Sequence, residues 1–533
     1  MIRISRYGKF ILSKKLIKSG LIVSIMTLVS RVLGLIRDVV IANVMGAGVA
    51  ADVFFFANKI PNFLRRLFAE GAFAQAFVPV LSEYHAKDGD KLGPETRQLI
   101  AQVSGTLGVL VTLVTLVGVI ASPLFVILFG FGWFWDWLHD GPKAEQFELA
   151  SFLLKITFPY LFFVSFTALA GAILNTLGKF AVSSFTPVLL NICIITCAIF
   201  LSPIMPNPAY ALAIGVFVGG VVQFMFQIPF LIQAGALVKP KWAWNSKGVS
   251  KIRKLIVPAL FGVSVTQINL LLDTLIASVL VTGSISWLYY ADRLLEFPLG
   301  LFGIGIATVI LPSLSKLHAK QSSGEFRDTV EWGLKIVSLF GWPALAGLMV
   351  LAQPIVMVLF MRGEFSEQTV LNVSYALFAY LSGLISFMFI KILAPAYYAR
   401  QDTKTPVIIG IKAMVANMAF NLMLAPFFGY VGLAIATTMS ASLNAFLLYR
   451  GLRNQNVFSL SSKALWFMAR IIISAGVMGV VVYLISPPFI EWLNMTKLEQ
   501  LIQLIICISL GVISYFFSII LFGIRMKDIK VLP

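Results

Sequence analysis

The chain has 533 residues, of which 59% are hydrophobic and only 12% are charged. A soluble globular protein carries about 25% charged and about 45–50% apolar residues, so this composition excludes an ordinary soluble protein and predicts a chain whose surface faces lipid. The net charge of +18 does not indicate nucleic-acid binding, because the basic residues sit in short clusters between apolar runs and form no continuous stripe.

The apolar runs predict an all-α polytopic membrane protein with about fourteen transmembrane helices. A spanning helix needs about 20 mostly apolar residues. We place the spans at residues 16–44, 49–82, 97–130, 147–177, 184–203, 208–236, 252–281, 286–315, 329–360, 369–399, 405–427, 430–452, 464–486 and 500–524. The first run is too long for a signal peptide and lacks a small-residue cleavage site, so we expect it to remain as a helix.

The distribution of Lys and Arg between the spans predicts the orientation. Basic residues fill the N-terminal segment and every second connection, at residues 3–18, 239–254, 316–327, 450–463 and 525–530. The alternate connections at residues 202–208 and 282–286 contain none. Because positive charge marks the cytoplasmic side, both termini are expected in the cytoplasm.

Internal repeats predict two lobes. PVLSEYHAK at residues 79–87 resembles PSLSKLHAK at 312–320, and Thr186-Pro187 is echoed by Thr405-Pro406. Six spans separate the members of each pair, which indicates two parallel six-helix lobes around a central cavity. The predicted parts are an N-lobe (1–238), a C-lobe (239–455) and two extra helices with a basic tail (456–533).

Charges inside the spans are candidates for function, since an unpaired ion at the bilayer centre costs at least ~2.5–3.5 kcal/mol. Arg31 follows twelve uncharged residues and precedes five more, which favours a position in a cavity over one that reaches the headgroups. Further charges in the first two spans are Arg37, Asp38, Asp52, Lys59, Arg65, Arg66 and Glu70. Arg66 and Glu70 are spaced to pair on one helix face. Several guanidinium groups in a wet cavity suit a polyanionic ligand, because each presents a fork that matches phosphate oxygens.

The eighth span adds Asp292, Arg293 and Glu296 beside Tyr289. The spacing predicts a partly neutralised charge network. A structural ion pair between the lobes is the alternative, and a pair that breaks when ligand binds would act as a gate.

Four residues with side-chain oxygen atoms predict a sodium site. Asp273 is a lone acid in an apolar run, Asn417 and Asn421 are one turn apart, and Thr437 lies in the next span. Oxygen ligands suit a small hard cation. The alternative is that these side chains join helices.

No motif indicates catalysis. Nucleotide-binding loops, catalytic triads and metal-hydrolase patterns are all missing from the sequence, so we expect no enzyme and no cofactor apart from the sodium ion. Cys193, Cys197 and Cys507 lie in apolar runs and read as small hydrophobic core residues.

Four stretches carry a family resemblance: SRVLGLIRDVVIANVMGAG (30–48), DVFFFANKIPNFLRRLFAEGAFAQAFVPVLSEY (52–84), WLYYADRLLEFPLGLFGIGIATVILPSLSK (287–316) and LAPAYYARQDTKTPV (393–407). They resemble the MurJ (MviN) lipid II flippases of the multidrug/oligosaccharidyl-lipid/polysaccharide exporter superfamily, and the likeness runs from about residue 18 to the last span. It implies two six-helix lobes and two final helices that line a groove for the lipid tail.

The resemblance also implies the site. The family's cavity arginines correspond to Arg31, Arg37, Arg65, Arg66 and Arg293, and its acidic partners to Asp52, Glu70 and Glu296. Asp38 and Asp292, identified above as charges within the spans, complete the predicted charge network. Some members of the family bind sodium, through residues that correspond to Asp273, Asn417, Asn421 and Thr437. Asn421 stands where a sodium-binding member has Asp, which removes a charge and weakens the case for ion coupling.

The expected function is therefore transport of lipid II from the cytoplasmic to the periplasmic leaflet of a bacterial inner membrane, by alternating access through a cationic cavity, for cell-wall synthesis. Expected partners are lipid II, membrane lipids and cell-wall synthesis or division proteins, with a functional monomer and no nucleic acid. An exporter of another polyprenyl-diphosphate-linked oligosaccharide is the nearest alternative. A drug/cation antiporter is less consistent with five basic positions, and a membrane glycosyltransferase would need a larger extracytoplasmic loop.

Overall fold

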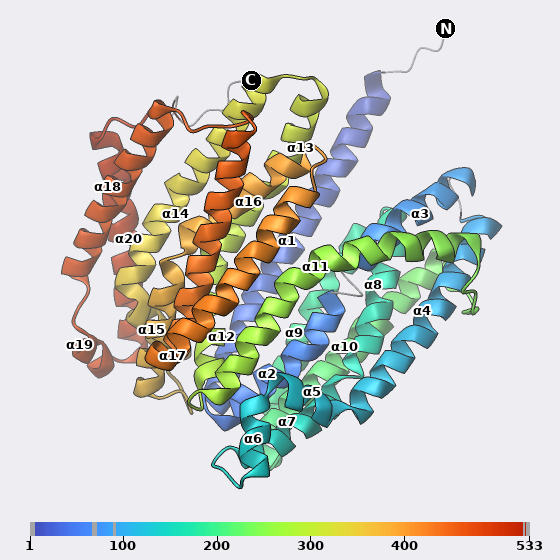
Figure 1. Ribbon diagram of the computed structural model, residues 1–533, viewed down its shortest axis with the longest axis horizontal. Helices are drawn as coiled ribbons and strands as arrows, with labels where there is room; N and C mark the ends of the chain where they lie inside the picture. The colour runs from blue at the N-terminus through green and yellow to red at the C-terminus, as the bar shows by residue number, and fades with distance from the viewer. Residues whose placement is uncertain (1–5, 67–71, 89–91, 526–527, 529–533) are drawn as a thin grey trace. The chain divides into compact units, whose positions relative to one another are not determined.

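The computed structural model describes residues 6–66, 72–88, 92–525 and 528, and these residues form helices and their connections (Figure 1). Within these ranges, nine helices are long and apolar enough to cross a membrane. The number rises to ten if α15 (Glu367–Leu381) and α16 (Leu384–Tyr398), which are bent by 42° relative to each other, form one span. An all-α polytopic membrane protein is confirmed, and the count of fourteen spans stays a prediction.

The chain forms two compact units, residues 1–279 and 280–533. The helices of the first unit are α1 (Arg6–Met45), α2 (Val49–Arg65), α3 (Ala72–Asp88), α4 (Pro94–Ile120), α5 (Ser122–Phe129), α6 (Phe131–Leu138), α7 (Ala144–Thr157), α8 (Tyr160–Thr176), α9 (Phe180–Phe200), α10 (Pro208–Gln233) and α11 (Lys247–Val279). The repeat pattern places residues 239–279 in the C-lobe. Here α11 lies in the first unit, because it packs on α3, α4, α5, α6 and α2.

Helix breaks in the first unit follow its glycines and prolines. The turn between α1 and α2 uses Gly46 at φ 60°, a left-handed conformation that glycine adopts without steric cost. The predicted span 97–130 divides into α4 and α5 just before Pro123, and the span 147–177 divides into α7 and α8 at Pro159. Proline lacks the N–H that would continue the helix.

The connection between α10 and α11 is fixed to α4. The Lys241 backbone N–H donates to the Ala101 carbonyl at 2.7 Å, and the Ala243 N–H donates to the Thr106 hydroxyl at 3.3 Å. Gly105 permits this approach, since a Cβ there would stand 2.3 Å from the Lys241 carbonyl carbon. Behind it, Phe77, Leu99 and Leu174 belong to the buried core shared by α3, α4, α8 and α11.

The second unit contains α12 (Ser284–Pro298), a π-helical turn (Leu299–Ile304), α13 (Gly305–Ala319), α14 (Ser323–Phe360), α15, α16, α17 (Lys404–Asn454), α18 (Ser462–Ile485), α19 (Phe489–Asn494) and α20 (Lys497–Leu521). Helix α17 is interrupted at Gly429, with φ 57° and ψ −136°. The two halves pack against each other, as the Ser440 hydroxyl donates to the Ala413 carbonyl at 2.6 Å. They correspond to the predicted spans 405–427 and 430–452.

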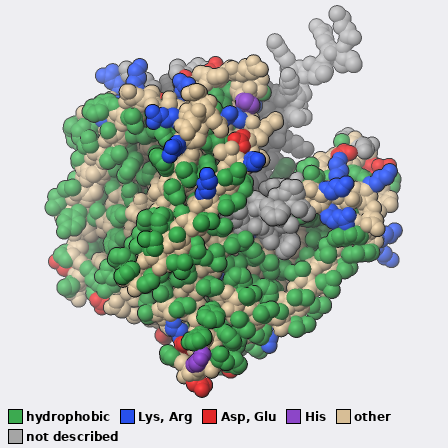
Figure 2. Space-filling view, in the orientation of Figure 1, with side chains coloured by type: hydrophobic (Ala, Val, Ile, Leu, Met, Phe, Trp, Pro, Cys, Tyr) green, Lys and Arg blue, Asp and Glu red, His purple; other side chains and the backbone are tan. Residues whose placement is uncertain are grey.

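The last two long helices pack on each other and on α14. The Tyr515 hydroxyl of α20 donates to the Leu339 carbonyl of α14, and a capping box of Thr496 and Glu499 starts α20. Large apolar side chains stay exposed on this pair, among them Tyr483 and Ile520. Hydrophobic side chains also dominate the face drawn in Figure 2, as expected of a surface in contact with lipid.

Candidate functional site

Arg37 of α1 belongs to an internal hydrogen-bond network. Its Nη2 and Nε donate to Asp38 Oδ1 at 2.7 and 3.0 Å, and its Nη1 donates to Asn191 Oδ1 on α9 at 3.0 Å. Asn191 in turn donates to the Ser30 carbonyl at 3.2 Å. Asp38 is only 3% exposed. The network therefore joins α1 to α9 and compensates a buried carboxylate.

Arg31 lies on the same helix in a different setting. Its side chain is exposed, between the exposed apolar side chains of Leu28 and Val32. It forms no hydrogen bond or ion pair with another residue in the part of the chain that the structure describes. A guanidinium in this position, within a largely apolar helix, is available to a ligand.

Two side-chain bonds connect α2 to α11. Lys59 Nζ donates to Thr274 Oγ1 at 2.9 Å, and Arg66 Nη1 lies 3.5 Å from Gln267 Oε1. Both pairs of positions are seven residues apart but run in opposite order, so the two helices are antiparallel. Arg65 Nε donates to Asn62 Oδ1 on its own helix at 3.1 Å. Glu70, the predicted partner of Arg66, lies outside the described residues.

Asp52 is buried in the first turn of α2, where a carboxylate interacts favourably with the helix dipole. Its negative charge also acts on Lys143. Burial lowers the pKa of Lys143, and the nearby charges of Asp136 and Asp52 offset only part of this decrease. Lys143 Nζ donates to the carbonyls of Ser278 and Val279 at 3.2 and 3.1 Å. Lys143 therefore anchors the C-terminal end of α11 within the first unit.

The charge network predicted on the eighth span stays a prediction, but two of its residues form an ion pair on α12 in the second unit. Arg293 Nη1 and Glu296 Oε2 are 2.8 Å apart, and the guanidinium carbon lies 5.0 Å from the centre of the Tyr289 ring. The Arg293 and Glu296 side chains are 35% and 48% exposed, and Asp292 is exposed beside them. An ion pair this accessible is weak and can exchange for another anion.

The four predicted sodium ligands are divided between the two units. Asp273 lies on α11, where Asn269 Nδ2 is 3.5 Å from its Oδ2. On α17, Asn421 Nδ2 donates to Asn417 Oδ1 at 2.9 Å, and Asn417 Nδ2 lies 3.4 Å from Thr437 Oγ1. Asn417 and Asn421 are buried. The bond between Asn417 and Thr437 joins the two halves of α17. Within the described ranges, no group of three or more His, Cys, Asp or Glu side chains gathers to hold a metal.

Sequence reasoning missed the polar partners of the arginines and lysines. The side chains of Arg37, Arg66 and Lys59 donate hydrogen bonds to Asn191, Gln267 and Thr274, respectively. A signal existed for Asn191, the lone polar side chain in the run PVLLNICII at 187–195. Gln267 and Thr274 are ordinary polar residues in a mixed run, and only the antiparallel packing of α2 and α11 reveals them.

Comparisons with known proteins agree with the resemblance. A family model described as "Lipid II flippase MurJ" matches residues 41–503. A probable lipid II flippase MurJ of Vibrio cholerae is 63% identical over 518 residues, covering 97% of this chain and 98% of the relative. One of Haemophilus influenzae is 60% identical, covering 94% of this chain and 98% of the relative.

Solved structures give the same family and a wider fold relationship. A lipid II flippase MurJ in an inward closed conformation superimposes with a TM-score of 0.78 at 28% identity, over 94% of this chain and 98% of that one. An inward-facing multidrug resistance MATE transporter of the MOP superfamily reaches 0.64 at 15% identity, over 80% and 94%, which shows similarity of fold alone. The chain therefore belongs to the MurJ family.

Proposed function

We propose that this chain flips lipid II from the cytoplasmic to the periplasmic leaflet of a bacterial inner membrane. The observation that carries the proposal is the 63% identity to a probable lipid II flippase over 97% of the chain. The site supports it, because the exposed or half-buried arginines of α1, α2 and α12 suit a diphosphate.

In this mechanism the arginines have different roles. Arg31 and Arg66 present exposed guanidinium groups, whose forked donors replace the water shell of the diphosphate. Arg65, the last residue of α2, directly precedes Arg66 in the chain. Arg37 is held by Asp38 and Asn191, so we assign it chiefly a positioning role, fixing the helix that presents Arg31.

Alternating access follows from competition for Arg293. Glu296 pairs with this guanidinium in the absence of ligand. A diphosphate that takes over the guanidinium releases Glu296, and binding then shifts the equilibrium toward the conformation that favours the new pairing. The undecaprenyl tail stays in lipid, along the exposed apolar side chains of α18 and α20.

Orientation and energy complete the proposal. We propose that both termini lie in the cytoplasm, because the basic connections favour that side of the membrane. A cavity with net positive charge responds to the membrane potential, at about 2.3 kcal/mol per charge per 100 mV, which supplies a driving force for resetting. Each chain contains both compact units, so we propose a functional monomer that hands its product to cell-wall synthesis proteins.

Complementation tests the function. A bacterium depleted of its own lipid II flippase is supplied with the wild-type chain, Arg31→Ala, Arg293→Ala or Lys320→Ala, an exposed basic residue outside the site. Membrane levels are matched by quantitative immunoblotting, and growth and accumulated lipid II are measured. We expect the wild type and Lys320→Ala to restore growth and both arginine variants to fail.

Each other outcome has a distinct meaning. A well-expressed wild-type chain that fails to restore growth would redirect the proposal to another polyprenyl-diphosphate-linked oligosaccharide. Restoration by both arginine variants would keep the family assignment and overturn the cationic binding role.

Sodium coupling stays a prediction for this chain. The oxygen atoms of Asn417 and Thr437 already accept hydrogen bonds, so the ion would have to compete with them. Replacement of external and internal sodium by potassium in the complementation strain, with the potential clamped, tests whether transport depends on the ion.

A further inference from the structure

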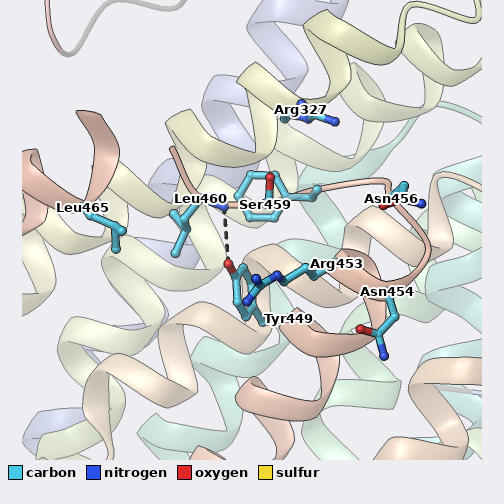
Figure 3. A pocket seen from close by; sticks show the side chains of 9 residues that line it. Arg327, Tyr449, Arg453, Asn454, Asn456, Ser459, Leu460 and Leu465 are labelled. Carbon is cyan, nitrogen blue, oxygen red and sulfur yellow. Dashed lines mark hydrogen bonds between the residues drawn. The ribbon is translucent and has the colours of Figure 1, made fainter. Parts of the chain in front are cut away.

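A polar pocket lies at one end of the second unit and is formed by residues other than the five candidate arginines (Figure 3). Its volume is about 830 Å³. It is formed where α14 begins, where α17 ends, and where the connection at residues 455–461 leads into α18. The lining residues are Arg327, Tyr449, Arg453, Asn454, Asn456, Phe458, Ser459, Leu460 and Leu465.

The lining is rich in hydrogen-bond donors and contains no carboxylate. The exposed side chains of Arg327 and Arg453 form no hydrogen bond or ion pair with any other residue that the structure describes. Figure 3 shows them on opposite sides of the connection that carries Ser459. The Tyr449 hydroxyl accepts from the Leu460 N–H at 3.4 Å, which leaves its own proton available to donate.

The acid one helical turn along α14 does not cancel this charge. Glu331 follows Arg327 by one helical turn, but its carboxylate is bound by Lys335 Nζ at 2.8 Å and by the Ser461 N–H at 3.1 Å. The N-terminus of α18, capped by Ser461, adds the positive end of a helix dipole beside the pocket. The pocket is therefore suited to an anion of compact shape.

Its position selects the kind of anion. Helices α14, α17 and α18 are each long and apolar enough to cross a membrane, so their shared end lies at the depth of the lipid headgroups. Apolar side chains border the donors, with Phe458 buried at the base and Leu465 54% exposed at the rim. A phosphate with acyl chains attached fits both the donors and this apolar edge.

We propose that this pocket binds the phosphate of an anionic phospholipid such as phosphatidylglycerol. Two arginines hold the phosphate oxygens, the amides of Asn454 and Asn456 and the hydroxyls of Tyr449 and Ser459 donate to the phosphate or glycerol, and Leu465 contacts an acyl chain. Basic pockets between membrane helices bind lipid headgroups in this way. The site is independent of Arg31 and Arg293 and does not require the transport cycle.

Native mass spectrometry of the purified full-length chain tests the site. Phosphatidylglycerol or phosphatidylcholine is added to the wild type, to Arg327→Gln/Arg453→Gln, and to the control Lys316→Gln/Lys320→Gln, which loses the same charge at exposed positions on the α13 side. Melting temperatures in lipid-free detergent verify folding, and Arg453→Gln alone serves if the double variant is unstable. We expect the phosphatidylglycerol adduct to fall about tenfold in the pocket variant only, as loss of charged hydrogen bonds predicts.

Two results would overturn the assignment. The assignment is wrong if the pocket variant and the wild type bind phosphatidylglycerol equally. It is also wrong if the wild type binds phosphatidylcholine as well as it binds phosphatidylglycerol. Millimolar inorganic phosphate is the second arm. If it raises the melting temperature of the wild type but not of the pocket variant, and no lipid adduct depends on the arginines, the ligand is free phosphate and the lipid assignment is wrong.

Discussion

Arg31 and Arg37 stand six residues apart on one helix, about 9 Å along its axis, yet they differ in every respect that matters for function. Arg37 reaches Asp38 and Asn191 and is largely buried. Arg31 is exposed and has no partner in the described part of the chain. The sequence separates them only in part: Arg31 has long uncharged flanks, whereas Asp38 directly follows Arg37. The difference shows that a charge within a span acquires its role from what the neighbouring helix places opposite it.

The same contrast recurs elsewhere. Asn417 and Asn421 bind each other inside α17, whereas Arg327 and Arg453 face an open pocket in the same unit. Side chains with internal partners stabilise the fold, and donors without them are free to bind a ligand. Four substitutions test this division.

The largest expected effect is on stability, at Arg37. Arg37→Ala removes the guanidinium that pairs with the buried Asp38, and loss of one partner of a buried pair costs about 3–5 kcal/mol. We expect a marked drop in the melting temperature of the purified chain. Arg37→Ala/Asp38→Ala removes both charges and should lose less. A single variant as stable as the wild type would refute the positioning role.

The next effect is on ligand binding, at Arg31. Arg31→Ala should retain the wild-type melting temperature, because no described residue depends on this side chain. Binding of purified lipid II, measured by native mass spectrometry, should weaken about 10- to 100-fold, the equivalent of one charged hydrogen-bonding group at about 1.5–3 kcal/mol. Arg31→Lys keeps the charge, so its affinity for lipid II should lie between those of the wild type and Arg31→Ala. A loss of stability that matches the loss of binding would erase the contrast with Arg37.

A smaller effect is expected at the buried asparagines of α17. Asn421→Leu removes the donor to Asn417 Oδ1 and should cost about 1–3 kcal/mol, measured by thermal unfolding. The same measurement in sodium and in potassium tests the cation site. Equal melting temperatures in the two salts leave the asparagines a structural role alone. A rise in sodium that Asn421→Leu abolishes supports an ion.

The smallest effect is local and depends on pH. The Thr96 hydroxyl, and then its N–H, donate to Asp88 and lower the pKa of this carboxyl below its usual 3.8. Since the pKa is lowered in the folded chain, the stabilisation is present above pH 3.8 and is lost as the pH falls through the folded value. The protection factor of the Thr96 amide, which corrects for the intrinsic pH dependence of hydrogen exchange, should fall in that window. In Asp88→Asn, the protection factor of the Thr96 amide should already be lower than in the wild type at neutral pH.

The sequence by itself determined the class, most helix positions and the family. Hydropathy depends only on which residues are neighbours in the chain, so the runs that became α9, α10, α14, α18 and α20 could be located within a few residues. The interruption of α17 follows from local chemistry as well, because Gly429 adopts a left-handed conformation that favours glycine. Charged positions such as Arg31 and Arg293 could be nominated for the same reason.

Only the tertiary structure decided which of those charges have partners on other helices. Asn191 lies 154 residues from Arg37, and Thr274 lies 215 residues from Lys59, so no local pattern connects them. It also packed α11 against helices of the first unit, and brought three helix ends together around Arg327 and Arg453. Hydrogen bonds act over about 3 Å, and which atoms come that close is set by how helices distant in the sequence pack.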